Sequence, residues 1–185
     1  PTYIPTMRTL ILGDIHNHYD TAERLIELIP HDQVVFVGDY FDSFGDGRNK
    51  AKRTAQWLKH SLSQPDRIHL FGNHDIPYCR HVYDCPGWEP RKDEAVKHIL
   101  KDLDWRRLRF FVWVDDWLIS HAGVHPTFIP TTVEHSLDEV KAWLEGQAEG
   151  AWQALFDPVC HGHWFWDRPG SRGGEAVIGG PLWQD

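Results

Sequence analysis

Apolar runs alternate with amphipathic segments through the first part of the chain. Short segments that end in apolar residues and are each followed by a glycine lie at residues 8–12, 33–37 and 67–71, and they predict buried strands. Between them, residues 20–28 and 50–63 carry apolar side chains at helical spacing and predict two helices. This alternation of strand and helix predicts an α/β fold with parallel strands at its centre.

The pattern beyond residue 71 is less regular. It predicts an irregular loop over 76–90, a helix over 91–103, strands over 109–114 and 117–120, a helix over 136–148 and a short strand at 176–178. Asp115 and Asp116 separate the two strands, which is typical of a hairpin with a two-residue turn. Ser136 and Glu139 form a capping-box pattern. No linker marks a second domain, so we expect one domain over residues 1–185. The alternative is that this domain is truncated at its C-terminal end.

A glycine and a group of polar residues follow each of the three expected strands, at residues 13–18, 38–42 and 72–75. In open α/β sheets, ligands bind beyond the carboxyl ends of the strands. We therefore expect the three loops to face one crevice. The expected hairpin ends in a fourth polar segment at residues 120–123, which contains His121.

The first loop carries Asp14 and His16 two positions apart. In an extended backbone such residues point the same way, so both can reach one cation. Carboxylate oxygen and imidazole nitrogen together suit Mn²⁺, Fe or Zn²⁺ better than Ca²⁺. The alternative is that Asp14 is a helix cap and His16 a surface histidine. For the helix over 20–28 itself, Asp20 or Thr21 is the expected cap.

The second and third loops add further candidates. Asp39 has two carboxylate oxygens and can bridge two cations, while Asp42 can orient a nearby imidazole. Asn73 offers a neutral amide oxygen as a metal ligand, and His74 beside it is a candidate catalytic acid. We expect Asp75 to brace the loop. The alternative for residues 38–42 is an acidic turn, and the alternative for residues 72–75 is an Asx-type turn.

Composition narrows the class of function. The chain has 41% hydrophobic residues and a net charge of −8, which indicate a globular protein without broad affinity for nucleic acid or acidic membranes. No apolar run approaches the length of a membrane span. Cys79, Cys85 and Cys160 form no CxxC pair, which favours a reducing compartment, and we expect the cytoplasm. A Cys79–Cys85 disulfide is the alternative.

The four polar segments together resemble the calcineurin-like metallophosphoesterase superfamily, in its phosphoprotein-phosphatase-like branch. That branch includes serine/threonine phosphatases and symmetrical diadenosine tetraphosphatases. The resemblance rests on GDIHNH at 13–18, GDYFD at 38–42, GNHD at 72–75 and SHAG at 120–123. It implies an α+β sandwich in which two packed, mixed β-sheets are flanked by helices.

The resemblance also implies two divalent metal ions, with Mn²⁺ as the first expectation and Fe or Zn²⁺ as alternatives. Asp14 and His16 would bind the first ion, Asp39 would bridge both, and Asn73 and His121 would bind the second. Two ions roughly 3.5–4 Å apart lower the pKa of a shared water, and the resulting hydroxide attacks phosphorus.

The implied catalytic pair is His74 and Asp42. His74 would protonate the leaving oxygen, and Asp42 would hold its ring. We expect hydrolysis of a phosphomonoester or a nucleotide anhydride, with a phosphorylated small molecule, a nucleotide or a phosphoprotein as substrate. A phosphodiesterase or nuclease is one alternative, which the acidic charge disfavours. A catalytically silent binding scaffold is the other, and it would have no need of a general acid.

Two segments depart from the family pattern. Ser43 and Phe44 stand where the phosphatase branch has an Arg-Gly pair whose arginine grips phosphate, so that clamp is absent. Asn17 stands where a glycine is usual, and His18 follows as an extra polar group.

The last metal histidine of the family has no clear match. The candidate is His163, in the segment 160–164, and the alternative is a residue beyond Asp185. Arg168 and Arg172 are candidate phosphate-binding residues, because a guanidinium matches phosphate bidentately. The alternative is that both arginines are surface charges on a loop.

Overall fold

The computed structural model describes residues 7–133, 136–157, 163–172, 174, 176 and 178–183. The chain divides into two compact units, Pro1–Ile119 and Ser120–Asp185. Each unit is described by itself. The expectation of one domain over residues 1–185 stays a prediction.

The first unit is built on a parallel sheet with the strand order β1-β2-β3. The strands are β1 (Thr9–Leu12), β2 (Gln33–Phe36) and β3 (Arg67–His69). The central strand β2 is the most buried, and Val34, Val35 and Phe36 are completely inaccessible to solvent. These are the residue types that favour a pleated, fully covered strand. The three strands lie within the ranges that the apolar runs predict.

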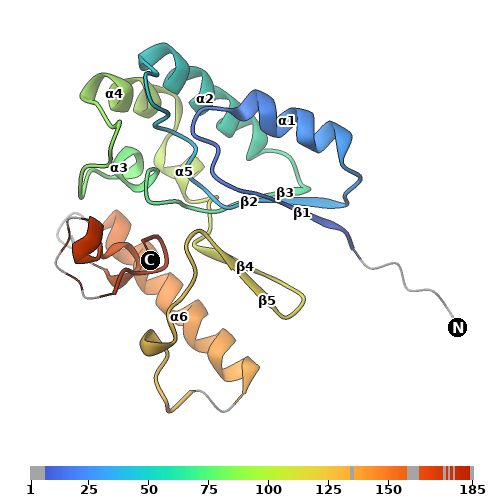
Figure 1. Ribbon diagram of the computed structural model, residues 1–185, viewed down its shortest axis with the longest axis vertical. Helices are drawn as coiled ribbons and strands as arrows, with labels where there is room; N and C mark the ends of the chain where they lie inside the picture. Colours follow the sequence, from blue (N-terminus) through green and yellow to red (C-terminus); the bar gives the residue numbers. More distant parts are fainter. Residues whose placement is uncertain are drawn as a thin grey trace, which may run out of the picture. The chain divides into compact units, whose positions relative to one another are not determined.

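Two long helices follow the first two strands. They are α1 (Tyr19–Leu28) and α2 (Arg48–Ser61), and both lie over one face of the parallel sheet (Figure 1). The buried face of α2 includes Ala51, Ala55 and Leu58, as the helical spacing predicts. The start of α1 differs from the expected one, because the helix begins one residue earlier and its N-cap is His18, without a side-chain cap.

The segment from residue 76 to 105 differs from the sequence prediction at two points. The expected irregular loop opens with a short helix, α3 (Ile76–Cys79). The expected helix over 91–103 is interrupted and forms α4 (Pro90–Ile99) and α5 (Asp102–Trp105). The interruption has a local cause, since Asp104 accepts a hydrogen bond of 2.9 Å from the backbone N–H of Lys101 and so starts a new helix.

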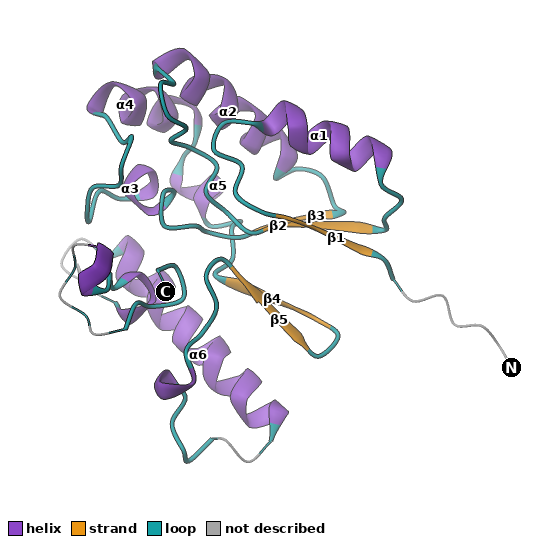
Figure 2. Cartoon of the chain, in the orientation of Figure 1, coloured by secondary structure: helices purple, strands orange, loops and turns teal. Residues whose placement is uncertain are grey.

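A second sheet consists of the hairpin β4 (Phe111–Val114) and β5 (Trp117–Ser120). It lies on the other side of the parallel sheet from α1 and α2 (Figure 2). The two sheets share a core in which Val112 packs with Val35 and Leu70. This arrangement confirms the expected α/β class with two packed sheets and flanking helices.

The second unit contains one long helix and three short 3₁₀ turns in its described part. They are α6 (Leu137–Phe156), η1 (Pro126–Phe128), η2 (Trp164–Trp166) and η3 (Gly170–Arg172). Helix α6 extends past residue 148, where the sequence predicts its end, and Ser136 caps it by accepting the backbone N–H of Glu139 at 3.2 Å. Ala176 forms an isolated bridge with Pro169 where a strand is expected, and residue 177 lies outside the described residues.

Two further expectations concern cysteines and membranes. Cys79 and Cys85 are free thiols, and Cys160 lies outside the described residues. None of the helices in the described part of the chain combines the length and the apolar character that a membrane crossing requires.

Candidate active site

The loops after β1 and β2 are joined by backbone hydrogen bonds. The N–H of His16 donates to the carbonyl of Asp39 at 2.7 Å, and the N–H of Asn17 donates to the carbonyl of Tyr40 at 2.8 Å. His16 and Asp39 have positive φ angles of 39° and 52°. Non-glycine residues rarely adopt this region, and such conformations gather at functional sites.

Asn17 stands where a glycine is usual in this motif, and its conformation and contacts suit that position. Its φ is 64°, a left-handed conformation that asparagine tolerates better than most residues. Its side chain is completely buried, where it accepts a hydrogen bond of 2.7 Å from Thr54 and donates one of 3.3 Å to Ser43. The substitution therefore keeps the turn and anchors it to α2.

Asp75 ties the loops after β2 and β3 together. One carboxylate oxygen accepts the backbone N–H groups of Asp39 and Gly72, each at 2.8 Å, and the other accepts that of Tyr40 at 2.9 Å. The residue is fully buried. Burial and the charge of Asp39 raise the pKa of Asp75. Asp75 has the bracing geometry that the sequence suggests.

Asp14, His16 and Asp39 present their polar atoms to a common point. Nε2 of His16 lies 3.8 Å from a carboxylate oxygen of Asp14 and 3.7 Å from one of Asp39. Nδ1 of the same ring contacts the carbonyl of Phe41 at 2.7 Å. A metal-binding histidine is typically oriented by such a second contact. This donor set fits a divalent cation of the Mn²⁺, Fe or Zn²⁺ type.

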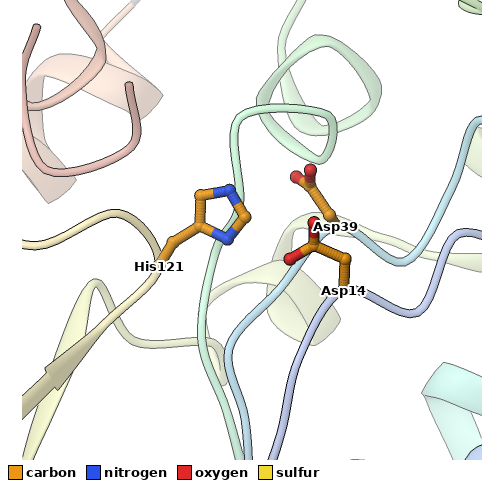
Figure 3. A group of neighbouring side chains, drawn as sticks. All are labelled: Asp14, Asp39 and His121. Atoms are coloured by element: carbon orange, nitrogen blue, oxygen red, sulfur yellow. The ribbon is translucent and has the colours of Figure 1, made fainter. Parts of the chain in front are cut away.

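The two carboxylates of this group approach each other. In Figure 3 the side chains of Asp14 and Asp39 lie close together and turn towards the same space. Both carboxylates belong to a candidate metal-binding group. His121 directly follows β5 and stands at the start of the second unit, so its part in the group belongs to the proposal below.

Asn73 is nearly buried, with 9% of its surface exposed. Its amide nitrogen lies 3.9 Å from the sulfur of Cys85, and its backbone carbonyl accepts hydrogen bonds from Tyr83 at 2.9 Å and Cys85 at 3.3 Å. These contacts anchor the backbone of Asn73 and place its amide beside Cys85. Nothing in the sequence singles out Tyr83 or Cys85 for this role, because both lie in an irregular loop.

His74 and Asp42 lie side by side. Nδ1 of His74 is 3.2 Å from a carboxylate oxygen of Asp42, and the backbone N–H of His74 donates to Asp39 at 2.8 Å. Burial lowers the pKa of His74, but the hydrogen bond to Asp42 and the charges of Asp39, Asp42 and Asp14 outweigh it, so the pKa is raised overall. These contacts favour the protonated form of the His74 imidazole beside the Asp42 carboxylate.

A pocket of about 590 Å³ opens over these residues. Its walls include Asp14, His16, Asp42 and His74, together with Ser43 and Phe44. The side chain of Phe44 is fully exposed. The charged wall can hold a cation and a phosphate, and Ser43 and Phe44 form an uncharged part of the lining.

Two residues that the sequence analysis does not single out also reach Asp42, namely Tyr78 and Lys92. The signal that would identify Lys92 is its position. Lys92 stands three residues before Ala95 and four before Val96, so it lies on the buried face of α4. A lysine on an apolar stripe indicates a buried partner of opposite charge.

The remaining predicted residues belong to the second unit. The guanidinium of Arg168 lies 6.0 Å from the ring of Trp183, and Arg172 is exposed at the end of η3. Nδ1 of His163 accepts the backbone N–H of Phe165 at 3.3 Å, and burial lowers the pKa of His163. Residues 161–162 of the candidate motif lie outside the described residues. The phosphate-binding and metal-binding roles of these three residues stay predictions.

Solved structures give a comparison of fold. A single-residue mutant of a cold-active protein tyrosine phosphatase aligns with a TM-score of 0.54 and 20% identity, covering 98% of this chain and 57% of that one. The cold-active protein-tyrosine phosphatase of a psychrophilic Shewanella species aligns with a TM-score of 0.50 and 19% identity, covering 98% and 58%. At this identity, the likeness concerns the fold alone.

Sequence comparison gives relatives and a family. A symmetrical bis(5'-nucleosyl)-tetraphosphatase of Xanthomonas oryzae pv. oryzae (strain PXO99A) is 27% identical over 154 residues, which cover 76% of this chain and 46% of the relative. One of the same name from Xylella fastidiosa (strain M23) is 25% identical over 148 residues, covering 73% and 48%. The chain thus spans about half the length of the curated relatives it matches. Residues 7–178 match the family model of calcineurin-like phosphoesterases. The chain therefore belongs to the calcineurin-like phosphoesterase family.

Proposed function

We propose that this protein is a dinuclear metal-dependent phosphoesterase that hydrolyses a phosphomonoester or a nucleotide anhydride. The observation that carries the proposal is the pairing of His74 with Asp42 in the same pocket wall as Asp14 and His16. The pocket thus combines a cluster of cation ligands with a proton donor. Bound cations can activate a water and neutralise phosphate charge, and a proton donor can assist the departure of a basic leaving group.

Two ions are assigned to the ligands already described. Asp14 and His16 would hold the first, Asp39 would contribute to both, and Asn73 and His121 would hold the second. When bound, the ions supply positive charge for the phosphate oxygens and an activated water. Mn²⁺ is our first candidate, with Fe or Zn²⁺ as alternatives, because the ligand set mixes carboxylate, amide and imidazole. His163 is the candidate for a further histidine ligand.

His74 is the proposed general acid. Its Nδ1 is engaged by Asp42, so the proton to be transferred is carried by Nε2. The hydrogen bond to Asp42 raises the pKa of His74 and so favours the protonated ring. Asp42 fixes the ring and balances its positive charge. The leaving oxygen then departs as an alcohol or a phosphate rather than as an unprotonated anion.

The proposed substrate class is a nucleotide or another phosphorylated small molecule, with a phosphoprotein as the alternative. The two relatives described above are named as symmetrical bis(5'-nucleosyl)-tetraphosphatases. The pocket volume of about 590 Å³ exceeds what a phosphate group needs and leaves room for part of its substituent. Arg168 and Arg172 are retained as candidates for phosphate binding. We propose a cytoplasmic location, because the three cysteines form no CxxC pair and favour a reducing compartment.

Two other functions are less well supported. A nuclease would gain from a basic surface, whereas this chain has a net charge of −8. A scaffold without activity would gain nothing from a buried carboxylate that orients His74. The Asp42–His74 pair therefore favours an enzyme.

Hydrolysis assays test the proposal. The protein is supplied with Mn²⁺ and given 4-nitrophenyl phosphate or diadenosine tetraphosphate, alongside His74→Asn and His98→Asn variants. His98 is exposed on α4 and serves as the matched control. We expect the wild type and His98→Asn to hydrolyse at least one substrate. With an alkyl phosphomonoester assayed alongside, whose leaving alkoxide needs the proton, His74→Asn should be slower by about 10²-fold or more. The absence of hydrolysis with any divalent metal would refute the enzyme assignment, and equal rates in the two variants would refute the role of His74.

A further inference from the structure

Asp42 is held from more sides than its contact with His74 requires. Its side chain is fully buried, and its φ of 68° is in the left-handed region. One carboxylate oxygen faces Nδ1 of His74 at 3.2 Å. The other accepts a hydrogen bond of 2.5 Å from the hydroxyl of Tyr78 and lies 3.9 Å from Nζ of Lys92.

The lysine in this group is unusual in its burial. Only 2% of the surface of Lys92 is exposed, and its ammonium donates to the carbonyl of Gly87 at 2.7 Å. A buried ammonium carries a large desolvation cost unless a charge and hydrogen bonds compensate it. Asp42 supplies the compensating charge, and the carbonyl of Gly87 supplies the hydrogen bond. The two buried charges therefore depend on each other.

The loop that carries Gly87 closes the remaining side. A Cβ atom added at Gly87 would lie 3.1 Å from Cβ of Asp42. The φ angle of Gly87 is 90°, which residues with a side chain rarely adopt. Glycine thus lets the backbone approach the carboxylate and bring its carbonyl to Lys92. Tyr78, Lys92 and Gly87 come from α3, α4 and the loop between them, so three separate segments converge on Asp42.

The hydroxyl of Tyr78 can only donate to Asp42. Burial and the adjacent carboxylate raise the pKa of Tyr78 well above its usual value, so the phenol keeps its proton. A donor on one oxygen and a cation beside it prevent the carboxylate from rotating. The other oxygen then stays directed at the imidazole.

We propose that Tyr78 and Lys92 are positioning residues, which hold Asp42 so that His74 delivers its proton to the leaving oxygen. This inference rests on the proposed phosphoesterase function. The two residues then act in one step of the reaction, the protonation of the leaving group, and have no part in binding the metals or the phosphate.

The test compares two substrates that differ in their need for a proton. 4-Nitrophenolate leaves as a stable anion, whereas the alkoxide of an alkyl phosphate needs protonation as it leaves. Steady-state kinetics with Mn²⁺ give kcat and KM for both substrates with the wild type, Tyr78→Phe and Lys92→Met. Tyr40→Phe is the matched control, because it removes another buried hydroxyl, which contacts His69 and the carbonyl of Leu70 instead of Asp42.

We expect kcat for the alkyl phosphate to fall about 10- to 100-fold in both positioning variants, and kcat for the aryl phosphate to fall less than about 3-fold. KM and bound Mn²⁺ should not change, and Tyr40→Phe should keep the wild-type ratio of the two rates. In a His74→Asn background, Tyr78→Phe should have no further effect, since the two residues act through one step.

Equal losses with both substrates, or no loss with either, would overturn the positioning role while leaving the proposed function in place. A wild-type protein that hydrolyses neither substrate would overturn both. Tyr78→Phe keeps the volume of the side chain, so it decides the outcome even where Lys92→Met fails to fold.

Discussion

A carboxylate oxygen of Asp75 lies 2.8 Å from the backbone nitrogen of Asp39, whose own carboxylate faces the candidate metal site. Asp75 contributes no ligand atom in the proposed arrangement. It accepts three backbone N–H groups from two loops and thereby fixes the spacing between the ends of β2 and β3. The position of Asp39, a proposed metal ligand, thus depends on the buried carboxylate of Asp75.

The substitution Asp75→Ala should destabilise the fold. It leaves three buried backbone donors without their acceptor, and each unsatisfied donor costs about 1–3 kcal/mol. We expect the free energy of unfolding, measured in urea, to fall by about 3 kcal/mol or more. Asp20→Ala, at an exposed position in the first turn of α1, should cost less than about 1 kcal/mol. Equal effects of the two substitutions would contradict the bracing role.

Gly72 should be intolerant of any side chain. A Cβ atom there would collide with the backbone nitrogen and a carboxylate oxygen of Asp39. We expect Gly72→Ala to displace that carboxylate and to weaken Mn²⁺ binding in titration calorimetry by about 10-fold or more. Gly146→Ala is the control, because nothing lies within 4 Å of the added atom. An unchanged Mn²⁺ affinity in Gly72→Ala would argue against Asp39 as a ligand.

His69 should make stability depend on pH. Burial lowers its pKa to about 3, whereas the unfolded chain binds the proton near its ordinary pKa of about 6.5. Between these values the unfolded state binds more protons, so stability falls as the pH falls, by at most about 1.4 kcal/mol per pH unit.

Urea unfolding at several pH values between 5 and 8 measures this slope in the wild type and in His69→Gln. The variant should lose the part of the slope below about pH 6.5. Ser61 and Tyr40 each lie 3.0 Å from a ring nitrogen of His69, so the glutamine retains polar neighbours. Identical slopes in the two proteins would refute the prediction.

Ser43→Arg should restore a phosphate clamp. Ser43 lies in the pocket wall with Asp42 and His74, at the position where the resemblance places an arginine. A guanidinium there can bind a phosphate bidentately, so KM for a phosphomonoester should fall by about 3- to 10-fold. Ser43→Ala removes the hydroxyl without adding charge and serves as the control. Equal KM values in the two variants would contradict this view of the pocket.

The parts of the fold that local pattern determines are those that the sequence predicts well. The apolar runs around Val35 and the spacing of Ala51, Ala55 and Leu58 determine their elements locally. The break between α4 and α5 escapes prediction because it depends on a single side chain, Asp104, which caps a new helix. Helical spacing alone continues through that point.

Some residues of the candidate site can be predicted from the order of the strands, and others depend on the packing of helices. Asp14, His16 and Asp39 closely follow strands of one parallel sheet, so topology predicts that they meet. Tyr78 and Lys92 reach Asp42 only through the packing of α3 and α4, which no short motif records. Their partner lies more than thirty residues earlier in the chain.

Metal dependence tests the central claim most directly. The protein is stripped of metal and titrated with Mn²⁺, and bound metal and the hydrolysis of diadenosine tetraphosphate and 4-nitrophenyl phosphate are measured on the same samples. We predict no hydrolysis without metal, a rise with occupancy and a plateau at two ions per chain. Full activity in the metal-free protein, or no hydrolysis with two ions bound, would contradict the account.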